Sequence, residues 1–262
     1  MLFLISALSL SILSCKKESE NESSTFDARS ALKMEAQVSS VSNLTIETGM
    51  SLAQINQVIA AATARDTVWV EAGTYAITGK IVMKAGIVLA KKTSVNPVFN
   101  ATATTTDLLS ASYNTELSNC VFSGITFWNY RFVIANATKV TFKYCIFDYG
   151  TRKAGTNETY YSDAYLQFTD TDSTLVNTCT FARRVNNSGR GIWLKSTTNS
   201  RILNCSFGNG GTTGYFVTAI NDNSESNSLI NNNIINRNTT LNTDLDQTDH
   251  GIYAHSFNGL TI

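Results

Sequence analysis

The chain has 262 residues, of which only 15% are charged, and its 20 basic and 20 acidic side chains give a net charge of zero. Nucleic-acid binding depends on a concentrated basic surface, so this composition excludes nucleic acid as a partner. The single proline and the abundance of Asn, Thr and Ser favour short strands joined by turns, because Asn and Gly tolerate positive φ.

The first fifteen residues are an apolar run that ends in Ser14-Cys15. The run is shorter than the roughly 20 residues that span a bilayer, and it fits the core of a signal peptide. Its end, Ile12-Leu13-Ser14-Cys15, resembles a bacterial lipobox, which implies that Cys15 is lipidated. The alternative is an ordinary signal peptide with an incidental Cys. We expect a signal peptide over 1–15 and a polar tether over 16–45. We also expect the chain to be anchored by its lipid to the bacterial outer membrane. The acidic stretch after Cys15 resembles the surface-export signal of Bacteroidetes lipoproteins.

A helix is predicted directly after the tether. Ser51 and Gln54 have the spacing of a capping box, and the apolar residues that follow share one helical face, namely Leu52, Ile55, Val58, Ile59 and Ala62. The adjoining stretch, residues 61–75, resembles the N-terminal cap of right-handed parallel β-helix proteins, many of which are polysaccharide lyases. This resemblance covers about residues 50–262 and implies that fold.

Cys-x-Phe occurs four times, beginning at Cys120, Cys145, Cys179 and Cys205, and a degenerate fifth copy follows as Asn232-Asn233-Ile234. A repeat of 20–50 residues is typical of stacked coils. We expect the cysteines to form a buried ladder of free thiols rather than disulfides or a metal site, since in-register side chains run parallel and the spacing supplies no CxxC pair. Asn119, Asn204 and Asn231 predict a short asparagine ladder at a tight turn.

Two further kinds of strand recur between the Cys-x-Phe copies. One kind comprises residues 132–134, 165–168, 191–194, 216–220 and 251–254, and the other comprises residues 140–142, 174–176, 201–203 and 228–230. Three strands in each repeat predict an all-β, right-handed parallel β-helix over residues 46–262, capped by the short helix. Because stacked folds need terminal caps, the half-strand at Asn258–Ile262 predicts a truncated C-terminus.

Cations gather in the variable segments of a weakly charged chain: Arg152, Lys153, Arg183, Arg184, Arg190 and Lys195. Together with nearby tyrosines they favour binding of an anionic polysaccharide, the alternative being ordinary solvated loops. A uronate lyase needs a cation to neutralise the carboxylate, a base to remove the C5 proton and an acid for the leaving oxygen. We assign Arg184 or Arg190 as neutraliser, Lys195 as base and Tyr165 as acid.

The stretch Lys195-Ser196-Thr197-Thr198-Asn199, followed by Asn204-Cys205-Ser206-Phe207, resembles a motif of the alginate lyase/chondroitinase B family, polysaccharide lyase family six. The resemblance implies that Lys195 is the base. That family binds calcium through two Glu residues before the Lys, but Ser188 and Arg190 stand at those positions here. It also carries an Arg on the next coil, which residues 217–220 lack. We therefore predict no cofactor, with calcium left as an alternative that the sequence does not support.

A second candidate cluster surrounds Asp249-His250, with Tyr253 and His255 on one face of the following strand. His255 is a candidate acid or base and His250 a substrate-binding residue. Trp193 and Tyr253 could stack on a sugar or belong to a core ladder. We expect a monomeric lyase that acts on an acidic polysaccharide, membrane-bound only through its lipid. The alternatives are a glycoside hydrolase or uronate epimerase of this fold, or a non-catalytic glycan-binding lipoprotein.

Overall fold

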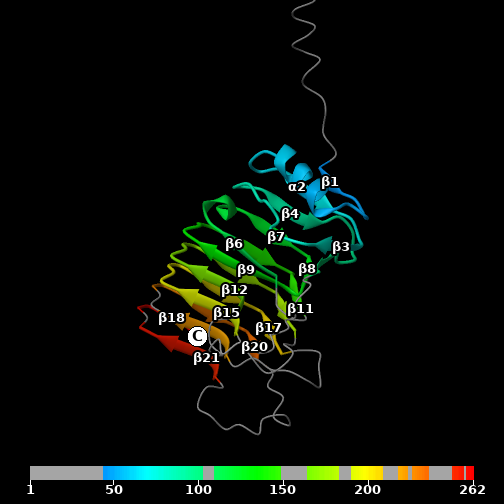
Figure 1. Cartoon of the computed structure of the whole chain (residues 1–262). Coiled ribbons are helices and arrows are strands. Elements are labelled where there is room, and N and C mark those ends of the chain that lie inside the picture. Colours follow the sequence, from blue (N-terminus) through cyan, green and yellow to red (C-terminus); the bar gives the residue numbers. More distant parts are fainter. Residues whose placement is uncertain are drawn as a thin grey trace, which may run out of the picture. The chain divides into compact units, whose positions relative to one another are not determined.

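The computed structural model of the chain describes residues 44–102, 109–148, 164–182, 190–208, 218–223, 226–235, 250–256 and 258–262. Cys15, with the signal peptide and most of the tether, lies outside the described residues. The described residues form a right-handed parallel β-helix, which confirms the predicted fold (Figure 1).

All the strands within these residues run parallel and form three sheets, named A, B and C. The strands of sheet A are β1 (Thr45–Ile46), β2 (Thr67–Val70), β4 (Val88–Lys91), β7 (Val121–Ser123), β10 (Thr141–Lys143), β13 (Leu175–Asn177), β16 (Arg201–Leu203) and β19 (Leu229–Asn231). Those of sheet B are β3 (Thr74–Ile77), β5 (Val98–Ala101), β8 (Thr126–Trp128), β11 (Ile146–Asp148), β14 (Thr180–Phe181), β17 (Ser206–Phe207) and β20 (Ile234–Ile235). Those of sheet C are β6 (Leu109–Tyr113), β9 (Tyr130–Ala135), β12 (Ala164–Thr169), β15 (Arg190–Lys195), β18 (Thr218–Asn223) and β21 (His250–His255).

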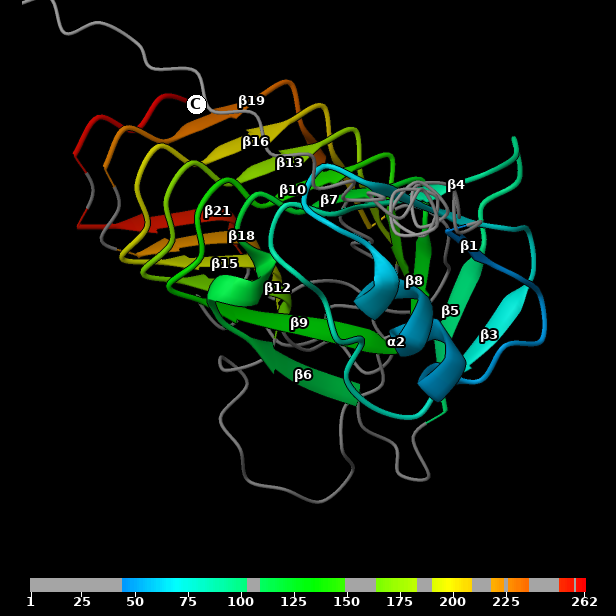
Figure 2. The same cartoon turned by 90° about the horizontal axis from the view of Figure 1, so that it is seen from above.

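From β6 onward each coil passes through sheets C, A and B in that order, while the described strands before β6 belong to sheets A and B. Neighbours in a sheet therefore come from successive coils. Figure 2 shows the strands of sheets A and C as separate layers joined by stacked turns. Residues at positive φ recur in the turns of successive coils, as Tyr144, Thr178, Asn204 and Asn232 do between sheets A and B. In this turn the Nδ2 of Asn232 donates to the Oδ1 of Asn204 at 2.7 Å.

The predicted capping helix is present as α2 (Leu52–Ala61), beside the first strands of the stack (Figure 1). The Ser51 hydroxyl accepts from the backbone N–H of Gln54, and the Gln54 side chain accepts from the backbone N–H of Ser51. Ile55 and Ile59 are its fully buried residues. The helix thus covers apolar surface that the first coil would otherwise expose. A 3-10 turn, η1 (Thr115–Leu117), joins β6 to β7.

The register of the Cys-x-Phe repeat differs from the prediction at both ends. Ile146 pairs with Thr126, so Cys145 is equivalent to Ile125, whereas Cys120 precedes a strand of sheet A. Phe122 pairs instead with Phe142. At the other end Ser206 pairs with Ile234, which makes Asn233, one residue later than expected, the equivalent of Cys205. Asn119 and Asn231 are also wrong as ladder members, since the ladder turn holds Asn204 and Asn232.

The prediction of free, buried cysteines is confirmed for Cys120, Cys145, Cys179 and Cys205. The ladder itself holds Cys145, Cys179 and Cys205, without Cys120. The rings of Phe147, Phe181 and Phe207 stack nearly parallel, with centroids 4.9 and 4.7 Å apart. Burial raises the pKa of the Cys179 thiol well above its usual range, so this thiol is a small core hydrophobe and not a nucleophile.

Candidate functional site

The outward face of sheet C gathers polar and aromatic side chains in two straight rows. On β15 the side chains of Ile192 and Leu194 are buried in the core, which turns Trp193 and Lys195 to the outer side of the strand. Register extends this assignment to the neighbouring strands. The first outer row is Ser112, Val133, Gln167, Trp193, Asn221 and Tyr253, and the second outer row is Ala135, Thr169, Lys195, Asn223 and His255.

Lys195 is exposed at the carboxyl end of β15, between Thr169 of one neighbouring strand and Asn223 of the other. His255 is exposed one strand beyond Asn223, and its Nδ1 lies 2.8 Å from the Ser256 hydroxyl. Adjacent strands are about 4.8 Å apart, so the backbones at Lys195 and His255 are separated by roughly 10 Å. A molecule seated over Asn223 is therefore within reach of both side chains.

Trp193 and Tyr253 share the first outer row, as stacking on one sugar requires, but they are not on neighbouring strands. Asn221 of β18 separates them. Tyr253 is 39% exposed, while Trp193 is half-buried. The two rings can therefore flank a sugar above Asn221, but they do not form a continuous aromatic surface.

Arg190 is buried rather than presented to solvent, with 7% of its surface exposed. Its guanidinium carbon lies 4.5 Å from the centre of the Trp193 ring, a cation–π contact. In this position it supports Trp193 and carries positive charge beneath the outer face.

Tyr165 is wrong as the acid, because the residue is fully buried. Its ring packs in the core, with centroids 6.1 Å from Phe147 and 6.3 Å from Phe181. Alternation along the strand would turn this position outward, yet the residue lies near the start of β12 and its ring fills the corner between sheets B and C.

Several predicted residues lie outside the described part of the chain. They are Arg152, Lys153, Arg183 and Arg184, which belong to the segments that lead from sheet B to sheet C. His250 opens β21 and pairs with Thr218, but only its backbone is described. Of the two arginines predicted to neutralise the substrate carboxylate, Arg184 and Arg190, the structure therefore describes Arg190.

Asn221 and Asn223 are candidate site residues that the sequence did not reveal. The predicted strand 216–220 ends before them, and Asn-Asp-Asn-Ser is a sequence typical of a turn. In the structure β18 continues through Asn223. Equal strand lengths within sheet C were the available signal, because placing Ile220 opposite Ile192 brings Asn223 opposite Lys195.

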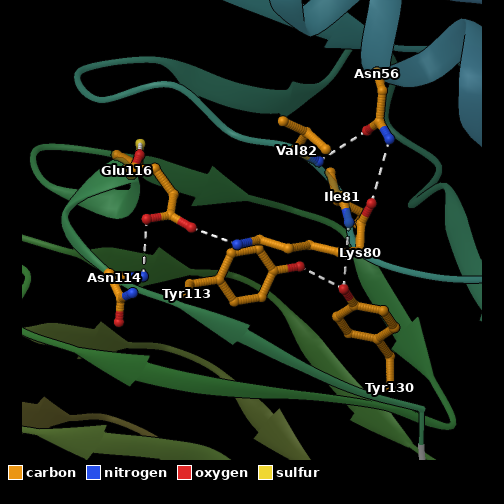
Figure 3. A network of polar contacts seen from close by, with 9 residues as sticks. Asn56, Lys80, Ile81, Val82, Tyr113, Asn114, Glu116 and Tyr130 are labelled. Atoms are coloured by element: carbon orange, nitrogen blue, oxygen red, sulfur yellow. Dashed lines mark hydrogen bonds and ion pairs between the residues drawn. The ribbon is translucent and has the colours of Figure 1, made fainter.

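A second polar cluster lies at the other end of sheet C, around the buried tyrosines of β6 and β9 (Figure 3). The hydroxyls of Tyr113 and Tyr130 bond to each other, and the Tyr130 hydroxyl accepts from the Ile81 backbone N–H at 3.5 Å. Lys80 pairs with Glu116 and lies over the Tyr113 ring. Burial raises the pKa of Tyr130 to about 12 and that of Tyr113 well above its usual range. The polar groups of this cluster bind one another, so the cluster holds the first coils together.

Calcium of the kind used by lyase family six does not fit the described residues. Arg190 places a cation at one of the family's acidic ligand positions, and no group of three or more candidate ligands occurs in the part of the chain that the structure describes. Of the carboxylates considered for a hydrolase, Asp222 is fully buried in the inner row, opposite Leu194. No described helix is long and apolar enough to span a membrane.

No protein-family model, no curated protein and no solved structure matches the chain. The functional argument therefore depends on the fold and on the geometry of the outer rows.

Proposed function

We propose that the chain is a lyase that cleaves a uronate-containing polysaccharide by β-elimination, with Lys195 as the base. The observation that carries the proposal is the alignment of Lys195, Asn223 and His255 in one row on the outer face of sheet C. An exposed amine, an amide and an imidazole on three successive strands supply a base, a hydrogen-bonding group and an acid.

The reaction is a proton abstraction followed by loss of a leaving group. Lys195 takes the proton from C5 of the uronate, the electron pair forms the C4–C5 double bond, and the bond from C4 to the glycosidic oxygen breaks. That oxygen receives a proton from His255. Lys195 and His255 extend from strands roughly 10 Å apart. A sugar bound over Asn223, on the strand between them, would therefore have Lys195 on one side and His255 on the other.

Neutralisation of the substrate carboxylate is needed, because it makes the C5 proton acidic. Arg190 supplies positive charge beneath Trp193, in direct contact with its ring. The arginines and lysine predicted in the segments before β12 and β15 would add to this charge. No step is assigned to a metal.

The test is the ultraviolet absorbance of the unsaturated uronate product, measured with the full chain on alginate, pectate and chondroitin. We expect a steady rise with at least one of the three polymers. Absence of product from all three would refute the lyase, and retained binding without product would favour a non-catalytic glycan-binding protein.

We also propose that the protein is a monomer anchored to the outer membrane by a lipid on Cys15, as the lipobox-like sequence implies. Metabolic labelling with a fatty-acid analogue tests the anchor. The label should appear on the wild type and be lost from Cys15→Ser.

A further inference from the structure

Three polar atoms on the outer face of sheet C are buried and have no hydrogen-bond partner among the described residues. They are Nε1 of Trp193 and the Oδ1 atoms of Asn221 and Asn223. A buried polar group without a partner destabilises a protein by about 1–3 kcal/mol, and such groups are few in native proteins. Three on two neighbouring strands call for a specific explanation.

Register places these groups together. Trp193 is directly opposite Asn221, and Lys195 is directly opposite Asn223. Along each strand the two outer residues are about 6.6 Å apart, and the strands are about 4.8 Å apart. Asn221 is only 4% exposed, although its register turns its side chain to the outer face. Tyr253 bounds this patch on the far side of Asn221.

The chemistry of the patch identifies what would satisfy it. The Trp193 N–H is a donor only, while each asparagine amide offers an acceptor at one end and a donor at the other. A carboxylate, sulfate or phosphate group without a proton can only accept hydrogen bonds, so it leaves the two amide oxygens unsatisfied. A sugar hydroxyl both donates and accepts, and the faces of Trp193 and Tyr253 suit the apolar face of a pyranose ring.

We propose that Trp193, Asn221 and Asn223 form a subsite that binds neighbouring hydroxyl groups of a pyranose. The inference deepens the proposed function, on which its biological meaning rests: the subsite adjoins Lys195 and would position the sugar that is cleaved. The substrate would then carry free hydroxyls at C2 and C3 of the residue in this subsite, and acyl groups at those positions would block it.

The test compares Asn221→Leu with Asn231→Leu in the full chain, because Asn231 is an exposed asparagine on β19 of sheet A, away from the site. Binding is measured by calorimetry with oligosaccharides of pectate and of alginate, each with free and with O-acetylated hydroxyls at C2 and C3. We expect Asn221→Leu and acetylation each to weaken binding about tenfold or more, and Asn231→Leu to have no effect.

Thermal unfolding without sugar separates a binding role from a structural one. Leu has the same number and branching of side-chain heavy atoms as Asn and removes an unpartnered buried carbonyl, so the Tm of Asn221→Leu should stay unchanged or rise. A Tm that falls together with unchanged affinity for the free oligosaccharides would overturn the subsite, as would equal binding of the acetylated and free forms. Weakened binding without any unsaturated product would keep the subsite and refute only the lyase.

Discussion

The two ends of sheet C treat their polar groups in opposite ways. Around β6 and β9, the hydroxyls of Tyr113 and Tyr130 bond to each other, and Lys80 pairs with Glu116 (Figure 3). Around β15 and β18, Trp193, Asn221 and Asn223 each retain a buried atom without a partner among the described residues. The same sheet, with the same strand spacing, thus carries a satisfied cluster at one end and an unsatisfied one at the other.

The outer rows change in the same direction along the stack. The strands β6 and β9 present Ser112, Val133 and Ala135, whereas β15, β18 and β21 present the aromatic, amide and cationic side chains. Satisfied polar groups fasten the first coils, and unsatisfied ones are kept where a ligand would bind, since function commonly occupies sites that are not optimal for stability. The contrast predicts that substitutions of these polar groups affect stability at the first end and activity at the second end.

The largest effect is expected from Lys195→Ala. Loss of a general base lowers the rate of product formation by about 100- to 10,000-fold, while the Tm should not change because the side chain is exposed. Lys143→Ala, on β10 of sheet A, is the matched control and should keep full activity. Equal rates for the two variants would remove Lys195 from the mechanism.

Gly191→Ala should cause the largest loss of stability. A Cβ at Gly191 would lie 2.6 Å from the carbonyl oxygen of Ala219 and 2.8 Å from the Phe207 ring, so backbone and core must both shift. Overpacking of this kind costs about 1–3 kcal/mol. Gly251 occupies the same position two coils later, where a Cβ would have its nearest neighbour on Ile235, 3.5 Å away.

Chemical unfolding of Gly191→Ala and Gly251→Ala measures this difference. We expect a lower midpoint for the first variant and an unchanged midpoint for the second. A similar loss in both would mean that the close contact at Gly191 relaxes without cost and that the site-bearing coils are looser than the structure describes.

The tyrosine pair tests the satisfied end. Tyr130→Phe removes a hydroxyl that bonds to Tyr113 and Ile81, which leaves buried groups unpaired and destabilises the fold by about 1–3 kcal/mol. In the wild type, burial raises the pKa of Tyr130 from 10.0 to about 12. The folded state therefore holds this proton more tightly, so the contribution to stability is complete below about pH 10 and is lost as the pH rises through about 12.

Alkaline unfolding, followed by circular dichroism, checks this dependence. The wild type should lose stability between about pH 10 and 12, and Tyr130→Phe should lose less over the same interval. Tyr144→Phe is the control, because Tyr144 is 54% exposed. Identical curves for the wild type and Tyr130→Phe would show that the buried pair does not govern the alkaline limit.

The sequence was sufficient for the fold because period-two apolar strands, positive-φ turns and a capping box are local signals. It was insufficient for register. Cys120 and Cys145 each precede a strand with a buried Phe two residues later, Phe122 in sheet A and Phe147 in sheet B. The Cys-x-Phe pattern therefore does not distinguish the two sheets. The burial of Tyr165 and the role of Asn223 were not predictable for a related reason. Tyr165 is buried at a corner between two sheets, and neighbouring strands extend β18 through Asn223, and both are tertiary effects.

The smallest effect is expected from Asp172→Asn. Asp172 lies in the turn between β12 and β13, and its side chain bonds to the corresponding turn of the next coil. The Asp172 carboxylate accepts from Thr198 Oγ1 at 2.6 Å, Asn199 Nδ2 at 2.8 Å and Ser173 Oγ at 2.8 Å, and these bonds lower its pKa below 3.8. Its contribution to stability is thus present above about pH 4 and is lost as the pH falls through the lowered pKa. Since the carboxylate is largely exposed, we expect about 1 kcal/mol or less.

Acid unfolding of Asp172→Asn and of the neighbouring control Asp170→Asn measures this contribution. The gap between the wild type and Asp172→Asn should be open at neutral pH and should close in acid, whereas Asp170→Asn should follow the wild type. Sugar binding should be equal in all three proteins, because the Asp172 bonds are already satisfied within the turn. A change in affinity at Asp172 would show that satisfied polar groups near β15 also serve the ligand, and the contrast between the two ends of sheet C would then fail.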